Sequence, residues 1–245
     1  MKKLFSTTLA LLLAASVTAQ FSLESISFGA RAGLNITSVY GTIDDAQHKA
    51  GFQLGILAQK PILDGRLTIQ SGLLFSQSGY RMNTSWETTE TLPMPPFGAM
   101  EIVTVADERL RMNISYLQIP INALFHFDIS DNARFVLQAG PYFAFGLGGS
   151  LTGGGTRTIT TTVPIIGPTV VDESYDIDGD IRFGVGPNDT RRFDFGLGIG
   201  AGVEFGNFQV GIGYNLGIRN LSNARDTSMR NTGFALTVTY LFDLF

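Results

Sequence analysis

Residues 193–218 read FDFGLGIGAGVEFGNFQVGIGYNLGI. Large apolar side chains or alanine take every second position on each side of Gly206-Asn207, and glycine or a polar residue fills the positions between. A period of two is the spacing of side chains on one face of a β-strand. A two-residue link that begins with glycine suits a type II′ hairpin turn. The stretch therefore predicts two antiparallel strands in which the numbers of facing residues sum to 413.

This register predicts particular cross-strand neighbours on both faces of the hairpin. On the apolar face Phe205 faces Phe208, Val203 faces Val210, Ala201 faces Ile212, Ile199 faces Tyr214 and Leu197 faces Leu216. On the other face Glu204 faces Gln209, and Asp194 faces Arg219 near the far end of the hairpin. A one-residue slip would exchange the two faces, so the apolar pattern specifies the register strongly.

The same alternation recurs along the chain and predicts eight strands. They lie near 26–38, 50–60, 65–80, 112–127, 133–149, 191–205, 208–220 and 232–243. The links at 61–64, 128–132 and 206–207 are short, whereas those at 39–49, 81–111, 150–190 and 221–231 are longer. Outer-membrane barrels combine an even strand number with short links at the periplasmic end and long links outside. We therefore expect both termini on the periplasmic side.

The two faces of these strands differ in composition. Phenylalanine and aliphatic residues share one parity, whereas most strand glycines and the strand charges take the other. Apolar residues outside and polar ones inside suit a barrel in lipid, while a soluble barrel would reverse them. Aromatic residues at both strand ends, where a membrane barrel has its girdles, favour the membrane. The expected polar core of the lumen comprises Arg31, Arg66, Arg134, Arg192, Asp194, Glu204 and Arg219.

The N-terminus and the composition support export to a membrane. Residues 1–20 have a basic start, an apolar stretch and a small-residue cleavage site after Ala19 or Gln20, as in a secretion signal. The alternative, a single membrane anchor, would need a longer apolar run. The 16% content of charged residues is low for a soluble domain, and 29 glycines in 245 residues are many. The absence of cysteine excludes a disulfide framework and a lipoprotein anchor, and the formal charge of −4 gives no indication of nucleic-acid binding.

These features predict that residues 21–245 form one all-β domain, an eight-stranded antiparallel up-and-down transmembrane β-barrel of a Gram-negative outer membrane. Two prolines interrupt its expected ladder. Pro120 and Pro141 lie inside strands, and neither can donate a backbone hydrogen bond. If Phe127 faces Phe135 across the turn, the two prolines lie at one height. We therefore predict a gap or bulge in the wall at that level.

Four segments resemble the PorT-like outer-membrane β-barrel family of Bacteroidetes-type bacteria, whose members are often labelled porin family proteins. They are the signal ending Ala19-Gln20, FGARAGLN at 28–35, YLQIP at 116–120 and GFALTV at 233–238. The resemblance covers residues 21–245 and implies the barrel fold, with a role in protein secretion for some members. It supplies no catalytic residues. One departure is that Phe242 is in phase with the last strand, whereas the terminal Phe245 is not.

Candidate sites are few, and we expect no cofactor. His126 lies near the periplasmic end beside Asp128, and His48 lies in an outer loop near Asp44 and Asp45. Either His–acid set would suit a lipid-modifying enzyme, but a structural histidine is the simpler interpretation. The acidic run Asp176, Asp178 and Asp180 is similar to half of a calcium loop and lacks the closing glutamate.

The sequence thus favours a structural or binding role carried by the outer loops at 81–111 and 150–190. The apolar residues Val163, Ile165 and Ile166 are placed there to contact a partner, and packing against the other outer loops explains them equally well. Outer-membrane lipid and an envelope or secretion-machinery protein are the expected partners. A narrow channel for small solutes is the first alternative, and a lipid-modifying enzyme is the second.

Overall fold

The structure is a computed structural model that describes residues 26–43, 45–187 and 189–242, so the expected signal segment lies outside the described residues. Its regular elements are strands, apart from the short 3-10 helix η2 (Leu63–Gly65). The strands are β1 (Ser27–Gly41), β2 (Gln47–Ile62), β3 (Leu67–Pro93), β4 (Ala99–Ser130), β5 (Ala133–Val163), β6 (Gly167–Asp180), β7 (Phe193–Phe205), β8 (Phe208–Gly217) and β9 (Met229–Phe242). Within this part of the chain no helix is long and apolar enough to cross a membrane.

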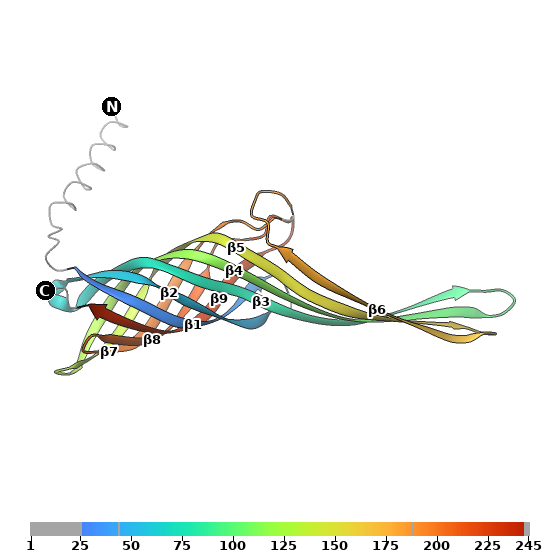
Figure 1. Cartoon of the computed structure of the whole chain (residues 1–245), viewed down its shortest axis with the longest axis horizontal. Helices are drawn as coiled ribbons and strands as arrows, with labels where there is room; N and C mark the ends of the chain where they lie inside the picture. The colour runs from blue at the N-terminus through green and yellow to red at the C-terminus, as the bar shows by residue number, and fades with distance from the viewer. Residues whose placement is uncertain (1–25, 44, 188, 243–245) are drawn as a thin grey trace, which may run out of the picture.

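Eight of these strands close into a ring. The hydrogen-bonded order is β4-β3-β2-β1-β9-β8-β7-β5, and β5 pairs with β4 to complete it. Each neighbouring pair is antiparallel, and the first and last strands pair from Phe28–Phe242 to Gly41–Met229. The prediction of an eight-stranded antiparallel up-and-down barrel is therefore confirmed. Figure 1 shows the strongly tilted strands of this ring.

The two faces of the wall follow the predicted parity. On β9, Leu236, Val238 and Tyr240 are exposed, whereas Thr237 and Thr239 between them are buried. Strand β1 alternates in the same way. Because a barrel buries only its inner face, the exposed aliphatic and aromatic residues form the outer surface. Lipid solvates this surface, and the buried polar residues face the lumen.

The predicted hairpin register at residues 193–218 is confirmed from the turn up to Gly196 and Gly217. Phe205 pairs with Phe208, Ile199 with Tyr214 and Glu204 with Gln209. Gly206 has a φ of +53°, in the left-handed region that favours glycine, so the turn needs this residue. The ladder ends at Gly196–Gly217, and the expected pairing of Asp194 with Arg219 lies beyond it.

The long links at 81–111 and 150–190 are not loops for most of their length. Strands β3 and β4 stay paired up to Pro93 and Ala99, and β5 continues to Val163. Strand β6 pairs with this outer part of β5, from Ser150–Asp180 to Val163–Gly167. These segments carry threonine and valine on both faces, so they favour strands without the apolar alternation that marks the wall.

The order β3-β4-β5-β6 thus makes a four-stranded sheet that leaves the barrel as a stalk (Figure 1). We call residues 82–93, 99–110, 151–163 and 167–179 the stalk, and the barrel end from which it rises the hairpin end. The opposite end carries the short turns at residues 63–66, 131–132 and 206–207. Figure 1 shows the last described residues of both chain ends there.

The predicted irregularity at the two prolines is confirmed. The β4–β5 ladder passes from Pro120–Tyr142 directly to Ala123–Ala139, so the rungs at Pro141 are missing. The β3–β4 ladder also skips two rungs, between Ser71–Ile121 and Leu74–Gln118. The Ser71 hydroxyl donates to the Pro120 carbonyl oxygen at 2.8 Å, and this bond replaces part of the lost backbone pairing.

Ile199 tests the assignment of the outer face. It lies at the middle of β7 and is 63% exposed. The substitution Ile199→Arg places a charge at mid-membrane depth and should lower the free energy of unfolding in lipid by roughly 2–4 kcal/mol. Urea unfolding in vesicles measures this change. The control Thr169→Arg, on exposed β6, should change stability little, and an equal loss in both variants would contradict the assignment.

Candidate functional site: the barrel interior and the stalk

A buried arginine network crosses the middle of the lumen. Arg31 on β1 is 5% exposed. Its Nε donates to Thr239 Oγ1 on β9 at 2.9 Å, and one Nη donates to Gln70 Oε1 on β3 at 2.8 Å. Gln70 in turn donates to Gln59 Oε1 on β2 at 3.0 Å. Because these partners come from four strands, the network ties one half of the ring together and fills the lumen at this level.

An ionic cluster closes the interior towards the short-turn end. Glu204 on β7 is 5% exposed and accepts a hydrogen bond from Arg134 on β5. His126 Nε2 on β4 lies 3.5 Å from Glu204 Oε2. Among the residues that the structure describes, Glu204 is the carboxylate with basic side chains within 4.0 Å, Arg134 and His126. The cluster joins three adjacent strands, β4, β5 and β7, and is sealed from the lipid by the wall.

A third group spans the full width of the barrel near the hairpin end. Asp194 on β7 is 1% exposed and accepts a hydrogen bond from Asn231 Nδ2 on β9 at 2.8 Å. The same amide lies 3.2 Å from the Tyr116 hydroxyl on β4, and the Tyr142 hydroxyl lies 3.5 Å from Asp194. In a ring of eight, β4 and β9 stand opposite each other. The contact between Tyr116 and Asn231 therefore bridges the lumen.

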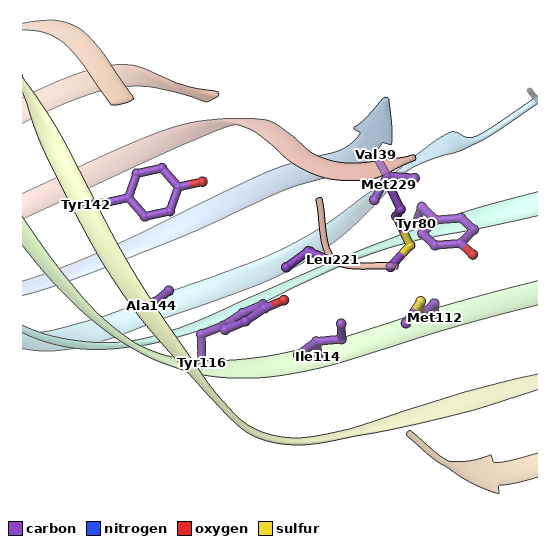
Figure 2. Close-up of a cluster of buried hydrophobic side chains, with 9 residues drawn as sticks. All are labelled: Val39, Tyr80, Met112, Ile114, Tyr116, Tyr142, Ala144, Leu221 and Met229. Carbon is purple, nitrogen blue, oxygen red and sulfur yellow. The ribbon is translucent and has the colours of Figure 1, made fainter. Parts of the chain in front are cut away.

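An apolar plug covers this polar group on the hairpin side. Its buried members are Val39, Tyr80, Met112, Ile114, Tyr116, Tyr142, Ala144, Leu221 and Met229 (Figure 2). Leu221 belongs to the link between β8 and β9 and is fully buried. Sequence reasoning expected only a polar lumen and missed this plug. The available signal was the large apolar residues at inward positions of β3, β4 and β5.

The space left inside the wall is small. Two cavities of about 40 Å³ each remain, and Gln53, Gln118, Tyr142 and Asn215 line both of them. Each has room for a few water molecules. A larger recess of about 530 Å³ opens on the hairpin side of the plug, and Met112 and Met229 are among the residues that line it. Three polar groups, around Arg31, Glu204 and Asp194, thus fill the interior. The apolar plug covers them on the hairpin side.

The seven expected lumen charges divide into two groups. Arg31, Asp194 and Glu204 are buried in the interior, and Arg134 reaches Glu204 from the rim. Arg66 is not in the lumen, because it lies exposed in the turn after η2. Arg192 precedes β7 and lies exposed, with its guanidinium 5.0 Å from the Phe183 ring centre.

The expected ion pair between Asp194 and Arg219 is a further correction. Arg219 follows the end of β8, and its guanidinium lies 5.4 Å from the ring centre of Phe193. Among the described residues no ion pair within 4.0 Å joins Arg219 to Asp194. Asp194 takes Asn231 as its hydrogen-bond donor instead. The register was predictable from the apolar pattern, but the rotamer of a long side chain beyond the last rung was not.

The remaining candidates do not converge on a site. His48 is exposed at the start of β2, and no ion pair joins it to Asp45 in the described part of the chain, while Asp44 lies outside it. Asp176, Asp178 and Asp180 lie in the regular strand β6 rather than in a calcium loop. An extended strand spaces alternate side chains along one face, so their carboxylates do not surround one point. No group of three or more possible metal ligands occurs within the described ranges.

Side chains join the strands of the stalk across a run of glycines. Tyr175 on β6 and Glu108 on β4 both flank Gly155 on the intervening strand β5. The Tyr175 hydroxyl donates to Glu108 Oε1 at 2.6 Å over this glycine. This hydrogen bond, followed by partial burial and the negative charge of Glu108, raises the pKa of Tyr175. The contact holds β4 and β6 together although neither pairs with the other.

The stalk ends in an exposed apolar tip. We define the tip as residues 92–98 of the first hairpin and 163–167 of the second. The two turns meet there, because a Cβ atom added to Gly98 would lie 3.6 Å from the Pro164 ring. Leu92, Phe97, Ile165 and Ile166 are 45%, 55%, 68% and 80% exposed. These side chains are held far from both the wall and the apolar plug.

Comparison with known proteins gives a family and several solved structures. A sequence model described as the outer membrane protein beta-barrel domain matches residues 18–223. No curated protein matches the chain. The attachment invasion locus protein Ail of Yersinia pestis aligns over 89% of this chain and 99% of its own, with 13% identity and a TM-score of 0.33. Neisserial surface protein A aligns over 88% of this chain and 97% of its own, also with 13% identity and a TM-score of 0.33.

The bridge across the lumen supports a stability prediction. Asn231→Ala removes the donor to buried Asp194, and an unsatisfied buried acceptor costs about 1–3 kcal/mol. We expect that loss in urea unfolding in lipid. Combining Asn231→Ala with Asp194→Ala removes both partners, so the double variant should lose less than the sum of the two single variants. Additive losses would show that the two side chains do not interact.

The filled interior also predicts electrical behaviour. The purified protein inserted into a planar lipid bilayer should show no stepwise ion current, because no continuous water path crosses the arginine network and the plug. A general porin in the same bilayer serves as the positive control. Regular open steps in proportion to the amount of inserted protein would contradict a closed lumen and restore the channel interpretation.

Proposed function

The chain belongs to the outer membrane protein beta-barrel domain family, and we propose that its barrel anchors a stalk that binds a protein partner through its apolar tip. It is an integral outer-membrane protein, so its barrel lies in lipid while the stalk extends into water. We further propose that the hairpin end faces the outside of the cell and that both termini are periplasmic. The sorting of short turns to one end and long hairpins to the other supports this orientation.

The observation that carries the proposal is the exposed tip. Ile165 and Ile166 are among the most exposed apolar side chains of the molecule, and they lie at the end of the structure farthest from lipid. Grouped apolar surface in water is unfavourable, and such patches mark interaction sites. Solvent-facing residues of the stalk are otherwise mainly threonine, serine and acids. Trp86, Val105, Val170 and Val171 are also exposed along the stalk, at 36–56%. The most exposed apolar side chains of the stalk, Ile165 and Ile166, therefore lie at the place where a partner would first make contact.

Charge indicates the chemistry of the partner. Glu87, Glu90 and Glu101 are exposed on the hairpin of β3 and β4 near the tip, and Asp172 and Glu173 are exposed on β6. Arg157 is the basic residue nearest the tip, and its guanidinium lies 6.0 Å from the Trp86 ring centre. A complementary partner offers an apolar recess with a basic rim. An envelope or secretion-machinery protein with such a surface is the partner class that we propose.

The tip can be tested in intact cells by photo-crosslinking. A benzophenone amino acid replaces Ile166 at the tip or, as a matched control on the stalk, Val171. We expect a discrete protein adduct from position 166 and none from position 171. Adding Phe97→Ser to the chain with the crosslinker at 166 should remove the adduct, because the neighbouring part of the apolar surface is lost.

Two outcomes would overturn this proposal. One is an equal adduct from positions 166 and 171, which would indicate nonspecific contact along the stalk. The other is an adduct that persists when Phe97→Ser is present. Heat-dependent migration on gels, measured for every variant, shows that the barrel itself has folded.

A further inference from the structure

Three basic residues gather on β2, β3 and β4 at the hairpin end of the wall. Arg81 on β3 and Arg111 on β4 are exposed, and Lys49 on β2 is half-buried. Arg81 has the same parity as the lipid-facing Leu73 and Phe75, and Arg111 has the same parity as the lipid-facing Ile119. The side chains of Arg81 and Arg111 therefore leave the sheet on its lipid side, above the apolar band, and not towards the lumen. Lys49 has the parity of the buried Gln53, but a register shift separates the two residues, and its Nζ reaches Asn113, which has the parity of Arg111.

The three cations stand close together. Arg81 and Arg111 are direct cross-strand partners. Lys49 Nζ donates to Asn113 Oδ1 at 2.7 Å, and the strand between them carries Gly79 opposite Asn113. With no side chain at Gly79, the lysine can cross β3. Partial burial first, and then the positive charges of Arg111 and Arg81, lower the pKa of Lys49.

No carboxylate within the described residues forms an ion pair with this cluster, and the acid in the same cross-strand row, Asp178, stands two strands away from Arg111. The described contacts of this kind lie at Glu204, inside the barrel, so no described carboxylate lies within 4.0 Å of Lys49, Arg81 or Arg111. Like charges directly opposite each other destabilise a sheet. The arrangement therefore costs stability in the isolated chain and offers a place where an anion would relieve the repulsion.

The height of the cluster restricts the source of that anion. The apolar row of the wall ends at Phe52, Phe75 and Leu117 on these three strands. Arg81 lies six residues beyond Phe75, which is about 20 Å along a strand and about 15 Å in height for the usual barrel tilt. The headgroup layer of a phospholipid bilayer adds only roughly 5–7 Å beyond the hydrocarbon. An anion carried on a larger, sugar-containing headgroup reaches this level.

The neighbouring residues suit a sugar phosphate. Gln47 lies directly across from Arg81, Asn83 is two residues farther along β3, and Asn113 accepts from Lys49. Their amides provide neutral hydrogen-bonding groups beside the guanidinium groups, which bind phosphate well. Arg109 lies two residues from Arg111 on β4, towards the tip. It lines a recess together with Asp107 and Asp176. The basic band is therefore narrow and ends where the acidic stalk begins.

We propose that Lys49, Arg81 and Arg111 bind the phosphorylated sugar headgroup of an outer-leaflet glycolipid. The contact fixes the depth of the barrel in the membrane beside the base of the stalk. It takes from the proposed function only the orientation of the hairpin end, and it does not depend on a partner at the tip.

The test measures lipid retained by the purified barrel. Wild-type protein is reconstituted in nanodiscs that contain lipopolysaccharide in both leaflets, extracted gently and analysed for bound glycolipid by native mass spectrometry. We expect the triple variant K49Q/R81Q/R111Q to retain at least tenfold less glycolipid. The charge-matched control R157Q/R182Q/R225Q removes three basic residues outside the cluster and should retain as much as wild type. R81K/R111K keeps the charges and should retain most of the lipid.

The source of the phosphate is decided by two further arms. Lipopolysaccharide dephosphorylated with hydrofluoric acid should be retained at the level of the triple variant, and millimolar inorganic phosphate should not displace the intact lipid. Equal retention by wild type and the triple variant, equal retention of the dephosphorylated lipid, or displacement by inorganic phosphate would each overturn the proposal. Because both leaflets carry the lipid and no partner is present, these results are separate from the crosslinking at the tip.

Unfolding separates binding from a structural defect. In detergent without phosphorylated lipid, removal of the opposed charges should leave the triple variant as stable as wild type or more stable. Addition of lipopolysaccharide should raise the unfolding midpoint of wild type and not that of the variant. A variant that is already less stable in plain detergent would assign the cluster a structural role and overturn the proposal.

Discussion

Backbone hydrogen bonding inside lipid is the constraint from which this structure follows. Hydrocarbon offers no partner to an N–H or C=O group, so a sheet that crosses it must have no free edge. The pairing of β1 with β9 removes the last edge and turns eight strands into a ring. The stalk is free of the constraint because it lies in water, and there β3 and β6 keep one open edge each. The change from ring to open sheet occurs along β5, which pairs with β7 up to Phe145 and with β6 from Ser150 onward.

Closure into a narrow ring also determines what fills the lumen. Glycines on inward positions of β7 and β8 leave room for a few large residues from other strands, and a Cβ atom at Gly196 would lie 2.7 Å from the Tyr142 ring. The space goes to Arg31, Tyr116 and Tyr142. Arg31 and Tyr116 bond to strands beyond their immediate neighbours, and Tyr142 bonds to Asp194 on the adjacent strand β7. The interior therefore acts as a set of cross-braces rather than as a passage, which leaves the surfaces outside the lumen to carry the binding roles.

The sequence allowed the wall to be predicted in detail and the site only in part. Alternating apolar residues and Gly206-Asn207 sufficed for the strand number, facing and register, because a slip would bury charges in lipid. Residues outside that pattern were harder to place. Arg66 and Arg192 lie just outside strands. Strand alternation predicts which face a side chain takes only within the paired part of a strand, so it could not place these two residues. The stalk lacks apolar alternation because water bathes both of its faces, and Leu221 enters the plug from a link without regular structure.

The continuity of β4 has a mechanical consequence. This strand runs unbroken from Ala99 near the tip to Ser130 at the short-turn end, a length of about 100 Å. Its hydrogen bonds lie across the strand, so a pull on the tip along the stalk loads many of them together in shear instead of opening them one by one. The tension passes directly into the wall embedded in the bilayer, with no hinge or flexible linker between. A load on the tip is therefore borne by the membrane anchor as a whole, which is how a rigid tether under flow or traction would need to be built.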